Sequence, residues 1–164
     1  MARADSDDQT RVATVRQLVE DLPVASEQRD GYERTKFRPW IDADRDECNT
    51  RAEVLKAEAV EAPTQAAGCK LTGGTWWSYY DDTEVTDAAG LDIDHMVPLA
   101  EAWDSGAYNW TAQRRQDYAN DLGYARSLVA VTARANRSKA DQDPANWMPP
   151  RRTRAASNWT TGCR

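Results

Sequence analysis

Two short strand-like segments, each followed by polar residues, restrict the folds open to this chain more than any other feature of the sequence. Residues 91–94 alternate leucine and isoleucine with aspartate, which predicts a short, half-buried strand that ends at His95, the only histidine. Residues 127–132 are apolar and β-branched, which predicts a buried strand, and residues 136–140 are expected to open a short helix. The middle of the chain therefore carries the order strand, helical loop, strand, helix.

The rest of the sequence predicts mainly helices and loops. Apolar residues at helical spacing over 9–22 predict an amphipathic helix that Pro23 ends. A capping-box pattern at residues 50–53 predicts a helix that runs to about residue 61, and the aromatic run 75–80 predicts a strand after a glycine turn. The other expected segments are an irregular stretch over 31–46, loops around Cys69 and over 81–90, helical turns over 98–103 and 143–147, and a helix that Thr111 caps.

The charge of the chain is distributed unevenly. The net charge is −6, but residues 122–164 hold eight basic and two acidic residues, whereas residues 1–121 hold 13 basic and 25 acidic ones. The basic C-terminal part fits the binding of phosphate groups, and it fits a solvated basic face equally well. No apolar run reaches the roughly 18 residues that a membrane span needs, so we expect no membrane partner. The first ten residues lack the pattern of a signal peptide.

Three cysteines, Cys48, Cys69 and Cys163, limit the covalent and metal-bound structures that the chain can form. None of them has the C-x-x-C spacing of a zinc ribbon or a redox site. Together with the single histidine they would suffice for a Cys₃His zinc site. One disulfide and one remaining cysteine is the simpler interpretation, and it would imply an oxidising compartment.

The residues with the clearest chemistry follow the two predicted strands. Asp94 and His95 end the first strand. Just after the second strand come Asn136, Arg137 and Lys139, and His95 precedes Asn136 by 41 positions. Hydrolysis of a phosphodiester needs an activated water and a cation that offsets the charge on the phosphoryl oxygens. Carboxylate and amide oxygens are ligands that suit Mg²⁺ or Mn²⁺, and a neutral imidazole can accept a proton from water near pH 7.

These residues also carry a resemblance to a known family. The pair D-H-x-x-P (residues 94–98) and N-R-x-K (residues 136–139), which flanks the L-V-A-V segment, resembles the motif of HNH nucleases, including the HNH domains of RNA-guided CRISPR nucleases. More closely, the chain is similar to secreted actinobacterial endonucleases of the HNH family. The stretches that carry this similarity cover most of the chain: LPV at 22–24, GYxRxxF at 31–37, CxxRxxxL at 48–55, a cysteine and GxW within 69–76, PLAEAWxSGA at 98–107, YANDL at 118–122 and DPAxWxPP at 143–150.

The resemblance implies an α+β fold in a single domain. It would consist of a ββα-metal (HNH) core at about residues 74–150, surrounding helices, and an N-terminal helical extension at about residues 9–62. Cys48 and Cys69 lie on either side of a predicted helix. This position, together with the family pattern, leads us to expect a disulfide between them.

The resemblance also implies roles for individual residues. Asp94 and Asn136 would bind one Mg²⁺ or Mn²⁺ ion, His95 would be the general base, and Lys139 would lie near the scissile phosphate. Many HNH nucleases place an asparagine just before the second strand to orient the base. Here residues 126–127 read Arg-Ser, so the sequence identifies no base-orienting residue.

The expected function is that of a secreted, monomeric, metal-dependent endonuclease that cuts DNA, with RNA as a further possible substrate. Arg134 and Arg137 are the expected substrate contacts. No separate recognition module is present in the sequence, so we expect cutting without sequence specificity. Two alternatives remain open: a non-catalytic extracellular binding domain on the same scaffold, and a metal-dependent hydrolase of small phosphoesters, whose activity would tolerate salt.

Overall fold

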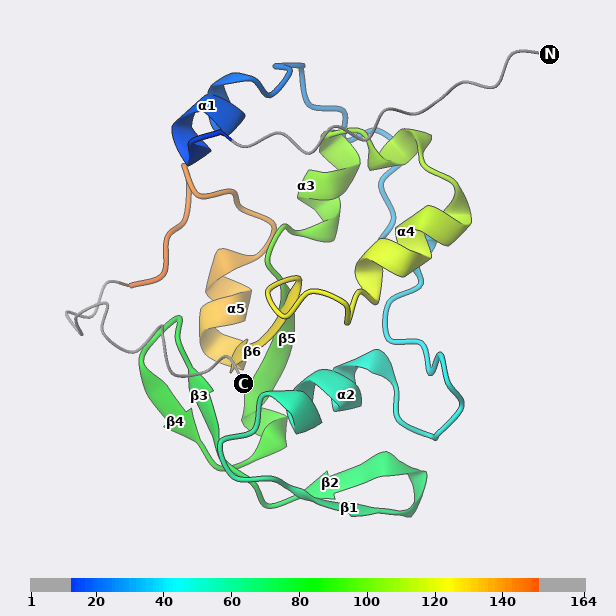
Figure 1. Ribbon diagram of the computed structural model, residues 1–164, viewed down its shortest axis with the longest axis vertical. Helices are drawn as coiled ribbons and strands as arrows, with labels where there is room; N and C mark the ends of the chain where they lie inside the picture. Colours follow the sequence, from blue (N-terminus) through cyan, green and yellow to red (C-terminus); the bar gives the residue numbers. More distant parts are fainter. Residues whose placement is uncertain (1–12, 151–164) are drawn as a thin grey trace.

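Short helices and strands surround a central pair of strands in the computed structural model, which describes residues 13–150 (Figure 1). The elements are α1 (Val15–Glu20), η1 (Arg34–Phe37), α2 (Thr50–Ala57), β1 (Thr64–Ala66), η2 (Ala67–Cys69), β2 (Lys70–Thr72), β3 (Trp76–Ser78), β4 (Thr83–Val85), η3 (Ala88–Gly90), β5 (Leu91–His95), α3 (Leu99–Asp104), η4 (Ala107–Asn109), α4 (Ala112–Ala119), β6 (Leu128–Thr132) and α5 (Ala133–Lys139). The strands form three separate antiparallel pairs, β1 with β2, β3 with β4, and β5 with β6. The chain is therefore a mixed helix and strand protein, and α5 directly follows the central pair.

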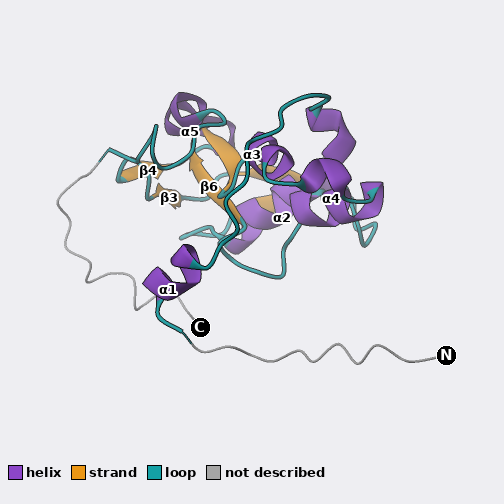
Figure 2. Ribbon diagram, turned by 90° about the horizontal axis from the view of Figure 1, so that it is seen from above, coloured by secondary structure: helices purple, strands orange, loops and turns teal. Residues whose placement is uncertain are grey.

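Strand β6 is buried on both faces, which explains its unbroken apolar sequence. Leu128 and Ala130 belong to a core cluster with residues of α2 and β3, among them Trp76. Val129 and Val131 point the other way, into a cluster with Ala135 of α5. Helices α2 and α5 thus cover opposite faces of the central pair, as Figure 2 shows from above. Strand β5 is also largely buried, rather than half-buried as the sequence predicts.

A third core cluster holds η1, α3 and α4 together. Phe37 of η1 is fully buried and packs against Trp103 of α3, with 6.3 Å between the ring centroids. Ala119, at the end of α4, is also fully buried in this cluster. The expected helix after Thr111 is confirmed, because the Thr111 side chain accepts a hydrogen bond from the Arg114 N–H at the start of α4. This cluster fixes the N-terminal segment against the helices that connect β5 to β6.

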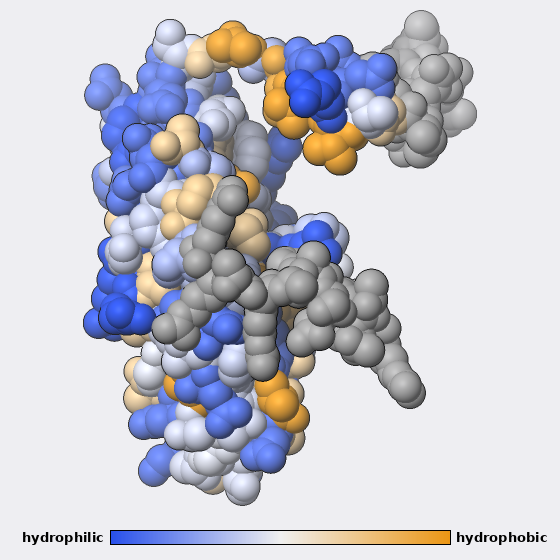
Figure 3. Space-filling model, turned by 90° about the vertical axis from the view of Figure 1, so that its left-hand side faces the viewer, coloured by the Kyte–Doolittle hydropathy of each residue, from blue (hydrophilic) through white to orange (hydrophobic). Residues whose placement is uncertain are grey.

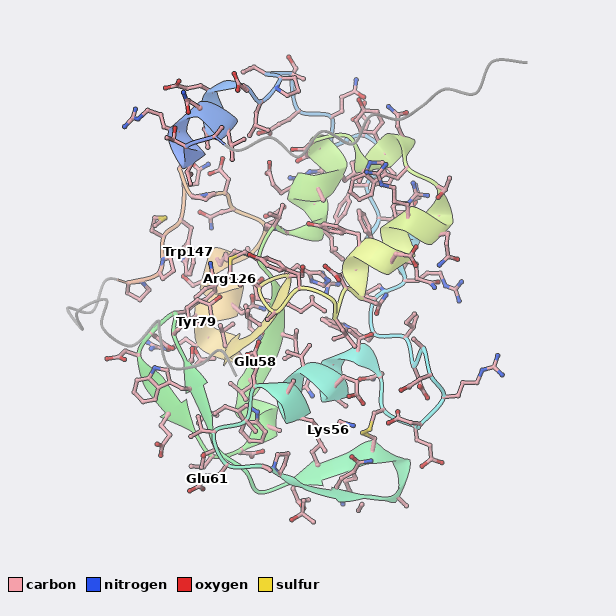
Figure 4. The ribbon with its side chains drawn as sticks, viewed as in Figure 1. Lys56, Glu58, Glu61, Tyr79, Arg126 and Trp147 are labelled. Carbon is pink, nitrogen blue, oxygen red and sulfur yellow. A yellow bond between two sulfur atoms is a disulfide. The ribbon has the colours of Figure 1, made fainter. Side chains whose placement is uncertain are left out.

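Side chains occupy the edge of β6 that does not face β5. The Ala130 N–H donates to the Glu58 carboxylate at 2.7 Å, and the Thr132 N–H donates to the Ser78 hydroxyl at 3.0 Å. Glu58 follows the last residue of α2 and lies beside the central pair of strands (Figure 4). These two side chains satisfy backbone donors that a third strand would otherwise pair.

The predicted disulfide is present between Cys48 and Cys69, whose Cα atoms are 5.0 Å apart. It connects the residues just before α2 to the turn between β1 and β2. Lys56 of α2 lies beside it, with its Nζ 3.3 Å from Cys48 Sγ (Figure 4). Because both cysteines are oxidised, they cannot supply thiolates, and the alternative of a Cys₃His zinc site is excluded. Cys163 lies outside the described residues.

Several predicted boundaries are wrong, and tertiary contacts explain one of them. The helix expected from Thr50 to about residue 61 ends at Ala57 and is capped by Asn49, whose side chain accepts from the Ala52 N–H. The Thr50 hydroxyl instead donates across the fold to the Ile41 carbonyl and to Asn120. The loops expected around Cys69 and over 81–90 contain β1, β2 and β4, which are three residues each and too short to show periodicity.

Helix α1 is shorter than the predicted helix over 9–22, of which residues 9–12 lie outside the described part of the chain. Thr14 and Gln17 form a capping box at its start, but none of its residues is buried. Its apolar side chains Val15, Leu18 and Val19 remain exposed on a segment that stands apart from the core (Figure 3). Among the residues described, no helix has the length and apolar character needed to cross a membrane.

Candidate active site

The end of β5 and one face of α5 border an open pocket of about 390 Å³. Asp94 and His95 reach it from β5, and Asn136 reaches it from α5. The structure therefore brings together three of the residues that the sequence selects, although Asn136 lies 41 positions beyond His95. The remaining lining residues include two arginines, Arg34 of η1 and Arg137 of α5.

The Asp94 carboxylate is buried and held by two donors. Its Oδ2 accepts from the Tyr80 hydroxyl at 2.5 Å and lies 2.9 Å from Lys139 Nζ, which is 3.1 Å from its Oδ1. Burial and the hydrogen bond to Asp94 both raise the pKa of Tyr80, so the hydroxyl keeps its proton and donates. A carboxylate can accept about four hydrogen bonds, so this arrangement fixes Asp94 and leaves acceptor capacity on Oδ1.

Lys139 is buried and is not among the residues that line the pocket. The prediction puts it near the scissile phosphate, whereas its side chain is only 5% exposed and donates to Asp94 and, at 3.2 Å, to the His95 carbonyl. The physical reason is its position in α5, three residues after Asn136 and thus on the same face of the helix, which packs on β5. Its ammonium compensates the buried charge of Asp94. Removing one partner of such a buried ion pair strongly destabilises a fold, because it leaves the other charge buried and unpaired.

His95 is buried and its ring is held on one side by a backbone carbonyl. Nε2 lies 3.0 Å from the Ala119 carbonyl oxygen, and the ring centroid is 5.4 Å from that of Trp40. A carbonyl can only accept, so Nε2 carries the proton and Nδ1 keeps its lone pair. Burial lowers the pKa of His95 to about 4, against the effect of the Ala119 hydrogen bond and with small contributions from the charges of Arg34 and Lys139. The ring is therefore neutral at neutral pH.

The sequence does not reveal the group that orients the His95 ring, which in the structure is the Ala119 carbonyl. It belongs to the C-terminal end of α4, 24 positions from the histidine. A backbone carbonyl has no side-chain signature, so no residue pattern marks it in advance. The position is available because the last carbonyls of a helix have no partner within the helix.

Asn136 presents its amide oxygen without a competing contact. Its Nδ2 donates to Asp92 Oδ2 at 3.3 Å, and no hydrogen bond within residues 13–150 engages its Oδ1. Asp92, which the sequence interpretation did not select, also lies 3.3 Å from Arg137 Nε. One carboxylate of β5 thus orients two neighbouring side chains of α5.

The oxygen donors of Asp94 and Asn136 fit a hard divalent cation. A carboxylate and an amide oxygen, with water and phosphate completing the shell, are typical of Mg²⁺ and Mn²⁺ sites, whereas zinc sites are built mainly from cysteine and histidine ligands. The free Oδ1 of Asn136 and the remaining capacity of the Asp94 carboxylate are the atoms that would hold it. Both residues line the same pocket.

The two predicted substrate contacts are separated in the structure. Arg137 is exposed and lines the pocket. Arg134 is not among the lining residues and instead pairs with Asp81, with 3.2 Å between Nη2 and Oδ2. Asp81 is buried and also accepts from Ser78 and Thr132. Although burial opposes it, these hydrogen bonds and Arg134 lower the pKa of Asp81, so Arg134 acts on an internal polar network.

Comparisons with known proteins identify the family of the chain. Residues 49–160 match the family described as GmrSD restriction endonucleases, C-terminal domain. An "Uncharacterized secreted protein" of Arthroderma benhamiae is 42% identical over 139 residues, which cover 84% of this chain and 67% of that protein. No solved structure matches the chain. Because the family match covers more than half of the 164 residues, the protein belongs to the C-terminal domain family of the GmrSD restriction endonucleases, an HNH-type endonuclease family with a nuclease-related function.

Proposed function

We propose that this protein is a metal-dependent endonuclease that hydrolyses phosphodiester bonds in DNA, with RNA as a second candidate substrate. One observation carries the proposal: Asp94, His95 and Asn136 converge on a single open pocket. The family implies a nucleic-acid substrate. In this proposal β5, β6 and α5 correspond to the ββα-metal core of HNH nucleases.

His95 is the general base of the proposed reaction. Its Nδ1 takes a proton from a water molecule, and the water oxygen forms a bond to phosphorus. The bond from phosphorus to the leaving oxygen breaks, and the leaving oxygen keeps the electron pair and takes a proton from solvent. The neutral ring is ready to accept the proton, and the Ala119 carbonyl holds it in the required tautomer. A divalent cation on Asp94 and Asn136 would offset the negative charge that develops on the phosphoryl oxygens.

The neighbouring residues keep these groups in place. Tyr80 and Lys139 hold the Asp94 carboxylate, and Asp92 holds the Asn136 amide. They are positioning residues, because their contacts are to the proposed metal ligands. Arg137 is the exposed pocket residue that would contact the substrate backbone. Arg134 is exposed but is not among the residues that line the pocket.

We further propose that the protein is secreted and acts as a monomer. The relative from Arthroderma benhamiae is described as secreted. The Cys48–Cys69 disulfide is consistent with an oxidising compartment, where such bonds persist.

Cleavage of supercoiled plasmid tests the proposed activity. We expect nicking with Mg²⁺ or Mn²⁺ and none with EDTA. His95→Ala should reduce the rate by roughly 10²–10⁴-fold, the usual contribution of a positioned base. The chain contains no other histidine that could replace it. Activity that survives EDTA, or a His95→Ala variant as fast as the wild type, would show that this mechanism is wrong.

A further inference from the structure

Arg34 is a pocket residue that the proposed mechanism does not use. It begins η1, and the buried Phe37 three residues later anchors this short helix against α3 and α4. The Arg34 side chain is exposed and lines the pocket together with His95 and Asn136. Its charge is close enough to lower the pKa of His95 slightly. A segment remote in sequence from β5 and α5 therefore places a guanidinium beside the proposed reaction centre.

Among the residues that the structure describes, the charged side chains around the pocket form ion pairs, with Arg34 as the exception. Asp94 pairs with Lys139, and Asp141 pairs with Arg29 at 2.7 Å. Arg137 pairs with Asp92. No carboxylate within residues 13–150 forms an ion pair with Arg34, whose neighbour is the Tyr32 hydroxyl. Among the residues that the structure describes, the exposed Arg34 guanidinium thus has a hydroxyl and not a carboxylate as its neighbour, which leaves N–H donors for an anion.

A polynucleotide offers more than one anion to such a pocket. Every nucleotide carries a phosphate, so the groups on either side of the scissile bond are charged. A guanidinium binds phosphate through two parallel hydrogen bonds, and this geometry distinguishes it from an ammonium. The pocket extends from Asn136 and His95 to Arg34, and therefore has room for more than the reacting phosphate.

Building on the proposed nuclease function, we propose that Arg34 forms a subsite for the phosphate that neighbours the scissile one. The subsite makes a polynucleotide, rather than a small phosphodiester, the substrate class of this site. Arg34 is a substrate-binding residue in this assignment. Its contribution lies in the affinity for the nucleic-acid chain, and it neither touches the metal ligands nor takes part in proton transfer.

The salt dependence of binding tests this subsite without requiring cleavage. Binding of a short DNA duplex is measured in EDTA between 50 and 200 mM salt, with His95→Ala as the background. Adding Arg34→Ala should weaken binding about tenfold and reduce the slope of log Kd against log salt by about 0.9, the value for one lost phosphate contact. Arg34→Lys should restore most of the slope, because it keeps the charge, and only part of the affinity.

Arg16→Ala is the matched control, because Arg16 is exposed on α1 and is not among the lining residues of the pocket. Adding Arg16→Ala to the His95→Ala protein should leave the slope of log Kd against log salt unchanged. An unchanged slope for Arg34→Ala, or an equal change for both variants, would overturn the subsite. Plasmid nicking by the wild-type protein is measured alongside. A reduced slope without any wild-type nicking would support the phosphate contact and reject the nuclease function, so the two failures are distinguishable.

Discussion

At the level of single residues, the Asp94 carboxylate depends on donors from distant parts of the chain. The Tyr80 hydroxyl comes from the segment after β3, and the Lys139 ammonium comes from the end of α5. Tyr80 also packs its ring against Trp147, with centroids 5.2 Å apart. Its hydroxyl thus holds Asp94 and its ring packs in the core, and a single substitution can remove the first contact and keep the second.

Replacing Tyr80 by phenylalanine should weaken metal binding while the fold is retained. The ring contacts remain, but Asp94 loses one of the two donors that orient it, and loss of such a supporting contact typically costs about 10–100-fold in metal affinity. Calorimetric titration with Mn²⁺ measures the effect. Tyr108→Phe is the control, because Tyr108 packs on Trp103 away from the pocket. Equal affinities in both variants would contradict this role of Tyr80.

Asn136→Ala should produce a defect that excess metal partly repairs. The substitution removes one proposed ligand and leaves His95 and Asp94 in place. The nicking rate at low Mn²⁺ should therefore fall, and it should recover in part as the concentration rises. His95→Ala should show no such recovery, because its defect lies in proton transfer. If the two variants respond to metal in the same way, the proposed division of roles is incorrect.

At the level of elements, the edge of β6 couples stability to pH. Burial raises the pKa of Glu58 from 4.5 to about 7, although the Ala130 N–H opposes this shift. The folded protein therefore binds this proton more tightly than the unfolded chain. The resulting stabilisation is complete below about pH 4.5 and is lost as the pH rises through 7. The shift corresponds to up to about 3 kcal/mol.

Glu58→Gln should remove this dependence. Glutamine retains an acceptor oxygen for the Ala130 N–H but does not titrate. In urea denaturation at pH 5 and pH 8, the variant should gain stability relative to the wild type at the higher pH, by up to about 3 kcal/mol. Glu61→Gln is the control, since Glu61 is exposed and close in sequence (Figure 4). A difference between Glu58→Gln and wild type that is equal at both pH values would refute the role of Glu58.

The sequence predicts the elements of the site better than their surroundings. β5, β6 and α5 follow from a run of alternating residues, an apolar run and polar residues after it, because burial on a strand or helix face produces such patterns. β1, β2 and β4 were missed because three exposed or half-buried residues leave no pattern. The Thr50 cap was misassigned because a contact with Asn120, 70 positions away, outweighs the local motif.

The same limit applies within the site. The proposed metal ligands and the proposed base could be selected because their residue types and spacing match the chemistry and a family motif. The contacts that hold these residues could not be predicted, because each one joins segments that no sequence pattern connects. These contacts are Tyr80 to Asp94, Ala119 to His95, and Asp92 to Asn136. The burial of Lys139 follows from the same cause, since packing on β5 decides where its ammonium lies.

At the level of the whole molecule, the disulfide supports a chain with several small cores. It closes a loop with a sequence separation of 21, which in the chain-entropy model stabilises the fold by about 3 kcal/mol. Replacing both Cys48 and Cys69 by alanine should lower the free energy of unfolding by about that amount in urea denaturation. Reductant should destabilise the wild type and leave the double variant unchanged. A wild-type protein indifferent to reductant would contradict this prediction.

The single histidine has a practical consequence for experiments on the intact molecule. Its ring lies at the centre of the candidate site, between the Ala119 carbonyl and Trp40. In a magnetic resonance spectrum, every imidazole signal of the folded protein therefore comes from this one position and needs no assignment. Tautomer, protonation and the arrival of a paramagnetic Mn²⁺ ion can each be read from it directly, so the protein contains its own reporter of the site.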